Sequence, residues 1–440
     1  MNFSDLKSVF SANGCREIYV KKLAANDINK SQVYVGGSFE LLNIFPIAKI
    51  EAITTNKKKA QKKKKDDHFF VNLNFCWIAD DLHLYSAPHA KFILYPQYPE
   101  VRFSGFLEGC QNAPSKLMTT KQSNRLLFLS VTRNKQVLGY VSSPHSNVSA
   151  DCKKHLKSAD DLGVFKIIKL TDEALFKRKL ITQLRRIHNL GWISSKRLDK
   201  QGIIQSCNAS NCGGYTLEAE LEIKPNGRSE PDFVGWEVKQ FGVTNFSRPG
   251  SRVITLMTPE PTGGYYKTHG LIEFLKKYGY KDKKKRAGRL NFGGVHKYGI
   301  INNTTGLILR FVGYDKKKGK IAKSGGSICL VDSDGKIAVS WSFAKLIERW
   351  SSKHNHACYV PSICKKGKRR KYKYGHLVFL NTGTDFELFL RQMVAGHIYY
   401  DPGIKYSSIG GTKARSQFRT KFIYLNDLYK KNEIVDLSLK

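Results

Sequence analysis

The sequence predicts a two-domain protein, an all-β domain followed by a mixed α/β domain, and three observations support that prediction. Short runs of alternating apolar and polar residues, separated by Asn, Asp, Gly and Pro clusters, fill residues 15–141. The periodicity is lost over residues 142–163, where Ser, Pro, Asp and Lys gather as they do in a linker. Beyond that segment helical and strand patterns mix. At about 100–200 residues per domain, 440 residues fit two such units.

The predicted strands of the first domain are short, and a small barrel is the natural way to close them. The runs that carry the alternating pattern are EIYVKKL, SQVYVGG, HFFVNLNFCWI, AKFILY and RLLFLSV. A lysine run at 57–67, KKKAQKKKKDD, interrupts them. A solvated loop is its plainer interpretation, with a nuclear-import signal or a phosphate-binding tether as alternatives. We therefore place an all-β domain at 1–150 and a linker at 151–170.

The second domain, residues 171–440, opens with a predicted helix. Its apolar residues recur at helical spacing, at Leu175, Leu180, Leu184 and Ile187. Thr171 is expected to cap the start of this helix and Gly191 to end it. Strand patterns follow in PDFVGWEVKQF, RVITLMT, GLILRFVGY, GSICLVD and KIAVSWSF, and helical patterns in SFAKLIERW and TDFELFLRQMV. This mixture predicts an α/β or α+β domain.

The charge balance restricts the class of partner. The chain carries 74 Lys and Arg against 36 Asp and Glu, so its formal net charge is 74 − 36 = +38. Such an excess draws a protein to polyanions, with nucleic acid the leading candidate and membrane headgroups the second. The apolar share of 41% and the aromatic share of 12% exclude a disordered basic arm.

Membrane and redox signals point to the cytoplasm. No run approaches the ~18–20 consecutive apolar residues of a membrane span, and residues 1–22 contain no apolar secretory core. Nine scattered cysteines, an odd number, fit reduced thiols better than a disulfide framework. Cys207 and Cys212 lie close together, but no second Cys or His pair stands at zinc-finger spacing. We expect a soluble cytoplasmic protein without a membrane partner.

The most informative stretch contains three charged residues at close spacing. Asp232 follows a proline, and Glu237 and Lys239 come next in the pattern D-x4-E-x-K. If residues 233–240 form a strand, Glu237 and Lys239 project from the same face, because side chains alternate along a strand. A chance match to so short a pattern is expected in about one chain of this length in ten, and a surface salt bridge is the alternative. The apolar neighbours and the basic charge of the chain favour a catalytic role.

A divalent cation would unite these residues in one site. Asp232, Glu237 and the backbone carbonyl of Val238 offer hard oxygen ligands that suit Mg²⁺. Lys239 would orient an attacking water or stabilise charge that develops on a phosphate. A further acid, Glu218, lies fourteen residues before Asp232 in a run with helical spacing, and it would be aimed at the same cation or a second one. Hydrolysis of a phosphodiester requires such a set.

The same residues carry a family resemblance. Glu218 and the segment EPDFVGWEVK at 230–239 resemble the active-site pattern of the PD-(D/E)xK nucleases, specifically the MvaI/BcnI restriction endonucleases and their mismatch-repair relative MutH. The fourteen-residue Glu-to-Asp spacing is shared, and WSF at 341–343 resembles a WSF that precedes a helix in MvaI. The resemblance implies an α/β PD-(D/E)xK nuclease fold and Mg²⁺-dependent hydrolysis of double-stranded DNA.

The end of the chain resembles the base-reading part of the same family. The residues QFR at 417–419 are similar to a closing F-R whose arginine reads a guanine, which implies that role for Arg419. A histidine-rich stretch that precedes it in MvaI is replaced here by TKARSQ at 412–417. His397 and Arg415 are candidates on chemical grounds, since Arg pairs with guanine O6 and N7. Phosphate contact or a solvated charge is the alternative for both.

The N-terminal region has a resemblance of its own. Residues 17–37, EIYVKKLAANDINKSQVYVGG, are similar to the start of the EcoRII effector domain, a DNA-binding pseudobarrel. Residues 101–109, VRFSGFLEG, fall where that domain presents one of its two recognition arms. The resemblance implies DNA-reading residues in both arms, namely Arg102, Ser104 and Glu108 in one and Gln32 and Tyr34 in the other.

Together the two resemblances imply a type IIE-like restriction endonuclease. It would bind two copies of double-stranded CCWGG, one in each domain, and would cut one of them as a monomer in a prokaryotic cytoplasm. The basic runs at 281–289 and 365–376 would clamp phosphates, with Tyr372 and Tyr374 as strand residues rather than stacking platforms. The alternatives are a MutH-like nicking endonuclease and a non-catalytic DNA-binding protein.

Overall fold

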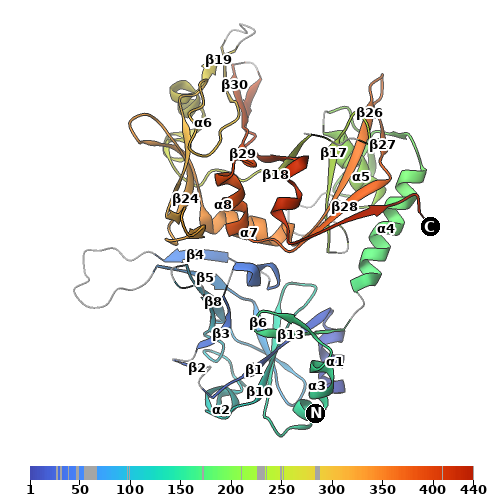
Figure 1. Ribbon diagram of the computed structural model, residues 1–440, viewed down its shortest axis with the longest axis vertical. Helices are drawn as coiled ribbons and strands as arrows, with labels where there is room; N and C mark the ends of the chain where they lie inside the picture. Colours follow the sequence, from blue (N-terminus) through green and yellow to red (C-terminus); the bar gives the residue numbers. More distant parts are fainter. Residues whose placement is uncertain are drawn as a thin grey trace. The chain divides into compact units, whose positions relative to one another are not determined.

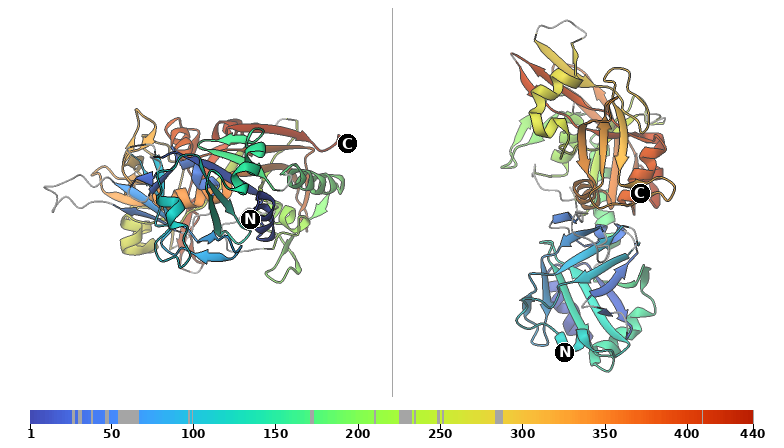
Figure 2. Two further views of the ribbon diagram at one scale, coloured as in Figure 1. Left: turned by 90° about the horizontal axis from the view of Figure 1, so that it is seen from below. Right: turned by 90° about the vertical axis from the view of Figure 1, so that its left-hand side faces the viewer.

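The structure is a computed structural model of the 440-residue chain (Figures 1 and 2). It describes all residues except 26–27, 30–31, 38, 46–48, 54–66, 97, 99, 171–172, 210, 225–232, 234, 248–249, 251, 283–287, 409 and 440. The chain divides into two compact units. The first contains Met1–Leu175 and Ile321–Gly325, and the second contains Phe176–Lys320 and Gly326–Lys440. The lysine run at 57–67 lies almost wholly outside the described residues.

The first unit is built from two sheets, so the predicted β-rich region is confirmed. The strand order in the seven-stranded sheet is β12 (Asp160–Leu162), β13 (Phe165–Lys169), β1 (Glu17–Leu23), β10 (Arg125–Val131), β11 (Val137–Ser142), β6 (Phe75–Ile78) and β7 (Leu84–Ser86). The order in the six-stranded sheet is β2 (Ile28–Asn29), β3 (Gln32–Gly36), β9 (Glu100–Ser104), β8 (Lys91–Tyr95), β5 (His68–Asn72) and β4 (Lys49–Ile53). Helices α1 (Phe3–Ala12), α2 (Ser115–Thr119) and α3 (Asn147–Leu156) complete the unit.

Aromatic side chains join the two sheets of the first unit. The ring of Phe75 on β6 lies 5.1 Å from that of Phe103 on β9. Phe45 contacts Tyr19 of β1 at 5.4 Å and Phe92 of β8 at 5.2 Å. All five side chains are buried, and aromatic pairs at such distances add to the free energy gained by burial. The alternating apolar positions of the sequence therefore face a core shared by both sheets.

The linker predicted at 151–170 is wrong, because these residues belong to the first unit. They end helix α3 and form β12 and β13, and β13 pairs with β1 in a register that sets Ile168 opposite Ile18. Cys152 and Ile168 are buried in the same cluster as Phe10 of α1. The polar side chains that suggested a linker include an exposed pair of lysines on α3. A helix this short needs only a few apolar residues to anchor it, so its sequence resembles that of a linker.

The main sheet of the second unit carries helices α4 (Glu173–Asn189) and α5 (Cys212–Glu220) (Figure 1). Its order is β14 (Ile193–Ser194), β27 (Lys371–Tyr374), β26 (His356–Lys365), β28 (Leu377–Thr382) and β33 (Lys431–Asp436), with β17 (Glu237–Gly242) pairing in parallel with β26. Leu180, Leu184 and Ile187 of α4 are buried as predicted. Leu175, which continues the same helical spacing, is 57% exposed.

Smaller sheets and three helices make up the rest of the second unit. Two sheets have three strands each, in the orders β18 (Val253–Met257), β32 (Phe418–Lys421), β29 (Ile398–Tyr400) and β21 (Ile308–Val312), β24 (Ser327–Val331), β25 (Ile337–Ser342). A four-stranded sheet has the order β19 (Tyr280–Lys281), β20 (Arg289–Gly293), β30 (Gly403–Ser407), β31 (Gly411–Lys413). Two further sheets are strand pairs, β15 (Lys196–Leu198) with β16 (Ile204–Ser206) and β22 (Tyr314–Asp315) with β23 (Lys320–Ile321). The helices are α6 (Tyr265–Tyr278), α7 (Phe343–His354) and α8 (Phe386–Val394).

The two predicted late helices form where the sequence places them. The Ser342 hydroxyl accepts from the backbone N–H of Lys345 at the start of α7, and the Asp385 carboxylate accepts from Leu388 N–H at the start of α8. Such side-chain caps stabilise a helix start by typically ~1 kcal/mol. Tyr372 and Tyr374 are buried in β27, so their interpretation as strand residues is confirmed.

One pair of cysteines departs from the expected reduced state. Cys207 and Cys212 form a disulfide, which links the segment after β16 to the first residue of α5. Seven further cysteines are free thiols. A short Cys-x4-Cys spacing alone does not show whether two sulfurs meet, because that depends on the turn between them. In the part of the chain that the structure describes, no helix is both long and apolar enough to cross a bilayer.

Candidate active site

Glu237 and Lys239 lie on β17, whose first residue is Glu237. The predicted strand over 233–240 is partly wrong, since Phe233 and Trp236 exchange backbone hydrogen bonds of 2.9 and 2.8 Å in a tight turn before it. Gly235, at φ 89°, supplies the positive φ of this turn, a conformation that side chains disfavour. Asp232 lies outside the described residues.

Successive side chains of β17 point to opposite faces of the sheet, so the residue that faces the core is separated from the residues of the site. Val238 belongs to the buried cluster that α4 and α5 cover, together with Cys358 of the neighbouring strand β26. Glu237 and Lys239 therefore project from the opposite face, as predicted from the period of two. The Lys239 ammonium donates to Glu237 Oε1 at 2.9 Å, which confirms that both side chains share that face.

Glu237 is a buried carboxylate held by cations. Its side chain is 5% exposed, and its second oxygen, Oε2, accepts from Lys353 Nζ at 3.5 Å. Burial alone would raise the pKa of Glu237, but the charges of Lys239 and Lys353 outweigh it and hold the pKa below the usual range. Glu237 is therefore ionised at neutral pH and ready to act as a metal ligand.

Glu218, on α5, interacts with the charges of Glu237, Lys239 and Lys353. The neighbouring Leu217 is 1% exposed and fixes this helix against the core, which confirms the predicted buried helix face. Burial and then the negative charge of Glu237 raise the pKa of Glu218, while Lys239 and Lys353 oppose the shift. Glu218 thus interacts electrostatically with both members of the β17 pair. The structure brings together three of the predicted catalytic side chains, namely Glu218, Glu237 and Lys239.

Two residues at the end of α7 were missed by the sequence analysis. Besides Lys353, His354 lies beneath the site and is fully buried. Its Nε2 donates to the Leu256 carbonyl at 3.1 Å, so its Nδ1, 3.2 Å from the Tyr429 hydroxyl, is the acceptor of a neutral ring. Burial, followed by the charge of Lys239, lowers the pKa of His354 to about 3. No spacing rule could link α7 to β17, because more than a hundred residues separate them.

The donor chemistry of the site fits a hard divalent cation. Glu218 and Glu237 supply carboxylate oxygens and Val238 a backbone carbonyl, the ligand types that Mg²⁺ prefers. Within the described residues, no group of three His, Cys, Asp or Glu side chains stands at metal-binding distance. The predicted ligand Asp232 is not among those residues.

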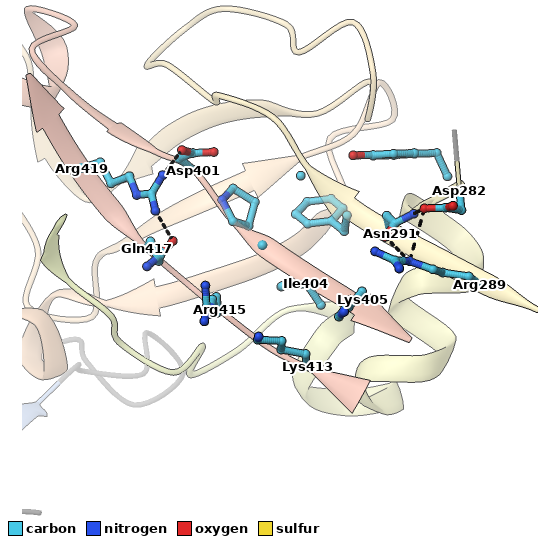
Figure 3. A pocket seen from close by; sticks show the side chains of 15 residues that line it. Asp282, Arg289, Asn291, Asp401, Ile404, Lys405, Lys413, Arg415, Gln417 and Arg419 are labelled. Atoms are coloured by element: carbon cyan, nitrogen blue, oxygen red, sulfur yellow. Dashed lines mark hydrogen bonds and ion pairs between the residues drawn. The ribbon is translucent and has the colours of Figure 1, made fainter. Parts of the chain in front are cut away.

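A second feature of this unit is a pocket of about 550 Å³ that contains two of the predicted base readers, Arg415 and Arg419 (Figure 3). Arg419 donates from Nη1 to Asp401 Oδ2 at 2.6 Å and from Nη2 to Gln417 Oε1 at 2.7 Å. Its guanidinium is therefore held in one orientation. Five basic side chains line the pocket, namely Arg289, Lys405, Lys413, Arg415 and Arg419.

The opposite wall of this pocket carries a second oriented arginine. Arg289 of β20 donates from Nε to Asn291 Oδ1 at 3.1 Å and lies 3.3 Å from Asp282 Oδ1. Figure 3 shows this group and the Arg419 group on separate strands, on two sides of the pocket. Arg289 belongs to the basic run at 281–289 that is predicted to clamp phosphates, of which residues 283–287 lie outside the described part of the chain. The pairing of β20 with β30 is what brings the two groups to one pocket.

His397, the third predicted reader of this domain, is not among the residues that line the pocket. Its ring stacks on Tyr424 with centroids 3.9 Å apart. Its Nδ1 lies 2.7 Å from Gln392 Oε1 and 3.4 Å from Asp427 Oδ2. These contacts hold the imidazole among Gln392, Tyr424 and Asp427, outside the pocket that Arg415 and Arg419 line.

The predicted readers of the first unit lie mainly on two paired strands. The register sets Gln32 opposite Ser104 and Tyr34 opposite Arg102, so the two predicted arms are neighbours in one sheet. Their strand neighbours, such as Val33 and Phe103, are buried, which turns these four side chains to the other face. Arg102 donates to Glu100 at 3.0 and 3.2 Å. Glu108 is exposed in the loop that follows β9.

A strongly basic chain that sets the buried carboxylate of Glu237 beside Lys239 and Lys353 has the features of a DNA-cleaving nuclease. A sequence model of the MvaI/BcnI restriction endonuclease family matches residues 181–429, more than half of the chain, so the protein belongs to that family. It is therefore a restriction endonuclease, a site-specific DNA hydrolase. No curated protein matches the chain.

Structures of the restriction endonuclease MvaI are among the solved structures that are similar to this chain. One is "Restriction endonuclease MvaI-cognate DNA substrate complex", with 19% identity, a TM-score of 0.45, and coverage of 60% of this chain and 99% of that chain. The other is "Restriction endonuclease MvaI in the absence of DNA", with 18% identity, a TM-score of 0.34, and coverage of 61% and 100%.

Proposed function

We propose that the protein is a type II restriction endonuclease that uses Mg²⁺ to hydrolyse double-stranded DNA at CCWGG. The observation that carries the chemistry is the cluster of Glu218, Glu237 and Lys239, set by α5 and β17 in a chain of the MvaI/BcnI family. The PD-(D/E)xK architecture and the target sequence rest on the sequence resemblance.

In this proposal the carboxylates hold the metal and the lysine serves the reaction. Asp232, Glu237, the Val238 carbonyl and Glu218 are the ligands, and the bound metal would lower the pKa of a water and neutralise charge on the phosphate. Lys239 lies beside Glu237, within reach of a phosphate at the same place. Its ammonium orients the attacking water and stabilises the negative charge that builds on the phosphate in the transition state.

Base recognition is assigned to the arginine pocket. Asp401 and Gln417 hold the Arg419 guanidinium in a fixed plane, and a planar arginine matches the O6 and N7 acceptors of guanine in the major groove. Arg415 lines the same pocket and is the second candidate. Lys405 and Lys413 suit phosphate contacts, which position the duplex without reading its sequence.

The first unit is assigned to a second copy of the target, as in a type IIE enzyme. The face of β3 and β9 that carries Tyr34 and Arg102 supports this assignment, because it collects side chains able to contact base edges and phosphates on one sheet. The protein would act as a prokaryotic cytoplasmic monomer. With one active site per chain, it would cut the two strands in successive events.

Plasmid cleavage tests the proposed function. Wild-type protein with Mg²⁺ should produce linear DNA with defined ends, and run-off sequencing of those ends gives the target and the cut positions. Lys239→Ala should abolish cutting while DNA binding in the absence of metal stays largely intact. A fully active Lys239→Ala protein would contradict the site, and a product that remains nicked would favour a strand-nicking enzyme.

A further inference from the structure

The two oxygens of the Glu237 carboxylate each face a lysine from a different element. Lys239, from the same strand, holds Oε1 at 2.9 Å. Lys353, from the last turn of α7, lies 3.5 Å from Oε2. A metal ion that binds Glu237 needs at least one of these oxygens. The ammonium groups therefore compete with the cation that the site is proposed to hold.

The backbone of Lys353 is firmly anchored, although its side chain reaches toward solvent. The adjacent His354 is buried and contacts Leu256 and Tyr429, and Trp350, one turn earlier, is fully buried and stacks on the His354 ring. The Lys353 side chain is 26% exposed. A lysine is a point charge on a flexible stem, so its ammonium can change partner while α7 stays in place.

Two ammonium groups lie against the Glu237 carboxylate, one at 2.9 Å and one at 3.5 Å. Lys353 acts electrostatically on both carboxylates. A divalent cation bound at Glu237 would have these two ammonium groups as near neighbours, and the repulsion between like charges weakens metal binding. A DNA phosphate would supply a negative partner for one of the lysines.

We propose that Lys353 couples metal binding to DNA binding. In the free protein its ammonium holds Glu237 Oε2 and keeps metal affinity low. When DNA enters, the ammonium transfers to a phosphate and frees that oxygen, so the metal binds tightly only in the complex. Lys353 is thus a positioning residue, and this role rests on the proposed metal-dependent nuclease function. Lys239 remains on Glu237 for the chemical step.

Metal binding to the free protein separates this role from a purely structural ion pair. Isothermal titration calorimetry with Mg²⁺ alone would compare wild type with Lys353→Gln and with Lys353→Met, which keeps the apolar stem. Both neutral variants should bind Mg²⁺ on the order of tenfold more tightly, because one nearby positive charge is gone. Lys353→Arg keeps the charge and should bind Mg²⁺ as the wild type does.

A matched control lies on the same helix. Lys345 has a 59% exposed side chain that pairs with Glu348, so Lys345→Gln removes one positive charge from α7 at a distance from Glu237. It should leave the Mg²⁺ affinity and the cleavage rate unchanged. If Lys345→Gln bound Mg²⁺ as tightly as Lys353→Gln does, the proposal would be overturned, because the change in net charge alone would then explain the tighter binding.

Cleavage supplies the second readout. In the wild type, the Mg²⁺ concentration that half-saturates plasmid cutting should lie well below the dissociation constant of the free protein. In the neutral Lys353 variants the two values should approach each other, and the maximal rate should fall because a phosphate contact is lost. Unchanged Mg²⁺ affinity of both neutral variants, once thermal melting shows that they fold, would overturn the coupling. A wild type that cuts no DNA would instead overturn the proposed function.

Discussion

The active-site cluster and the arginine pocket both gather charged side chains in the second unit, but they control those charges in different ways. In the cluster, Glu237 is 5% exposed and opposite charges crowd around it. In the pocket, Arg419 is 28% exposed and is held by hydrogen bonds to Asp401 and Gln417. Burial strengthens electrostatic interactions and shifts pKa values, whereas hydrogen bonds fix direction. The first arrangement suits metal-dependent chemistry and the second suits recognition.

The largest effect is expected from Glu237→Gln. This change removes the carboxylate that both lysines hold, so metal binding and cutting should fail together, with a rate loss of at least about 10²–10³-fold. Single-turnover cleavage of a plasmid in Mg²⁺ measures it. Glu348→Gln, which alters a 30% exposed helix carboxylate paired with Lys345, is the matched control and should cut normally. Equal rates for the two variants would contradict the distinction between the buried cluster and the Lys345–Glu348 pair.

A smaller and more selective effect is expected from Arg419→Lys. The lysine keeps the charge but loses the planar pair of donors, so about 1–3 kcal/mol of discrimination at one guanine should disappear. Competition cleavage of duplexes that differ at one base pair measures this loss. Lys413→Ala, from the same pocket, should weaken binding uniformly and leave discrimination intact. A uniform loss in Arg419→Lys would show that Arg419 contacts phosphate instead.

The smallest effect concerns stability and comes from Glu218→Gln. Burial and the charge of Glu237 raise the pKa of Glu218 above its ordinary value of 4.5. A raised folded-state pKa means that Glu218 stabilises the fold fully below its unfolded pKa, and that this contribution is lost as the pH rises through the folded value. Glu218→Gln cannot ionise, so it should increase the free energy of unfolding at pH 7 without metal. Denaturant unfolding across pH should show this gain shrinking on acidification, and a gain independent of pH would contradict the buried-acid interpretation.

Part of the candidate site follows from local spacing. Glu237 and Lys239 share a face because strand side chains alternate. The starts of α7 and α8 follow from Ser342 and Asp385, whose caps act over three residues. Each of these features is decided within a few residues, so the sequence shows it directly.

Other predictions failed because the deciding contacts are distant in sequence. The segment at 151–170 resembles a linker until β13 pairs with β1 and the few apolar side chains of α3 reach the first-unit core. Cys207 and Cys212 form a disulfide where composition predicted thiols. Leu175 continues a helical pattern but is exposed at the start of α4. Helical spacing predicts which face is apolar, and packing decides how far along the helix that face is covered.

The sequence by itself determined the basic charge, the β-rich first region, the family and the acidic pair with its lysine. Only the tertiary structure decided that Lys353 meets Glu237, that Arg289 faces Arg419 across one pocket, and that β3 and β9 place Tyr34 opposite Arg102. The physical reason is the range of the interactions involved. Backbone periodicity and helix capping act between near neighbours. These three juxtapositions depend instead on strand pairing and helix packing between segments that are far apart in the sequence.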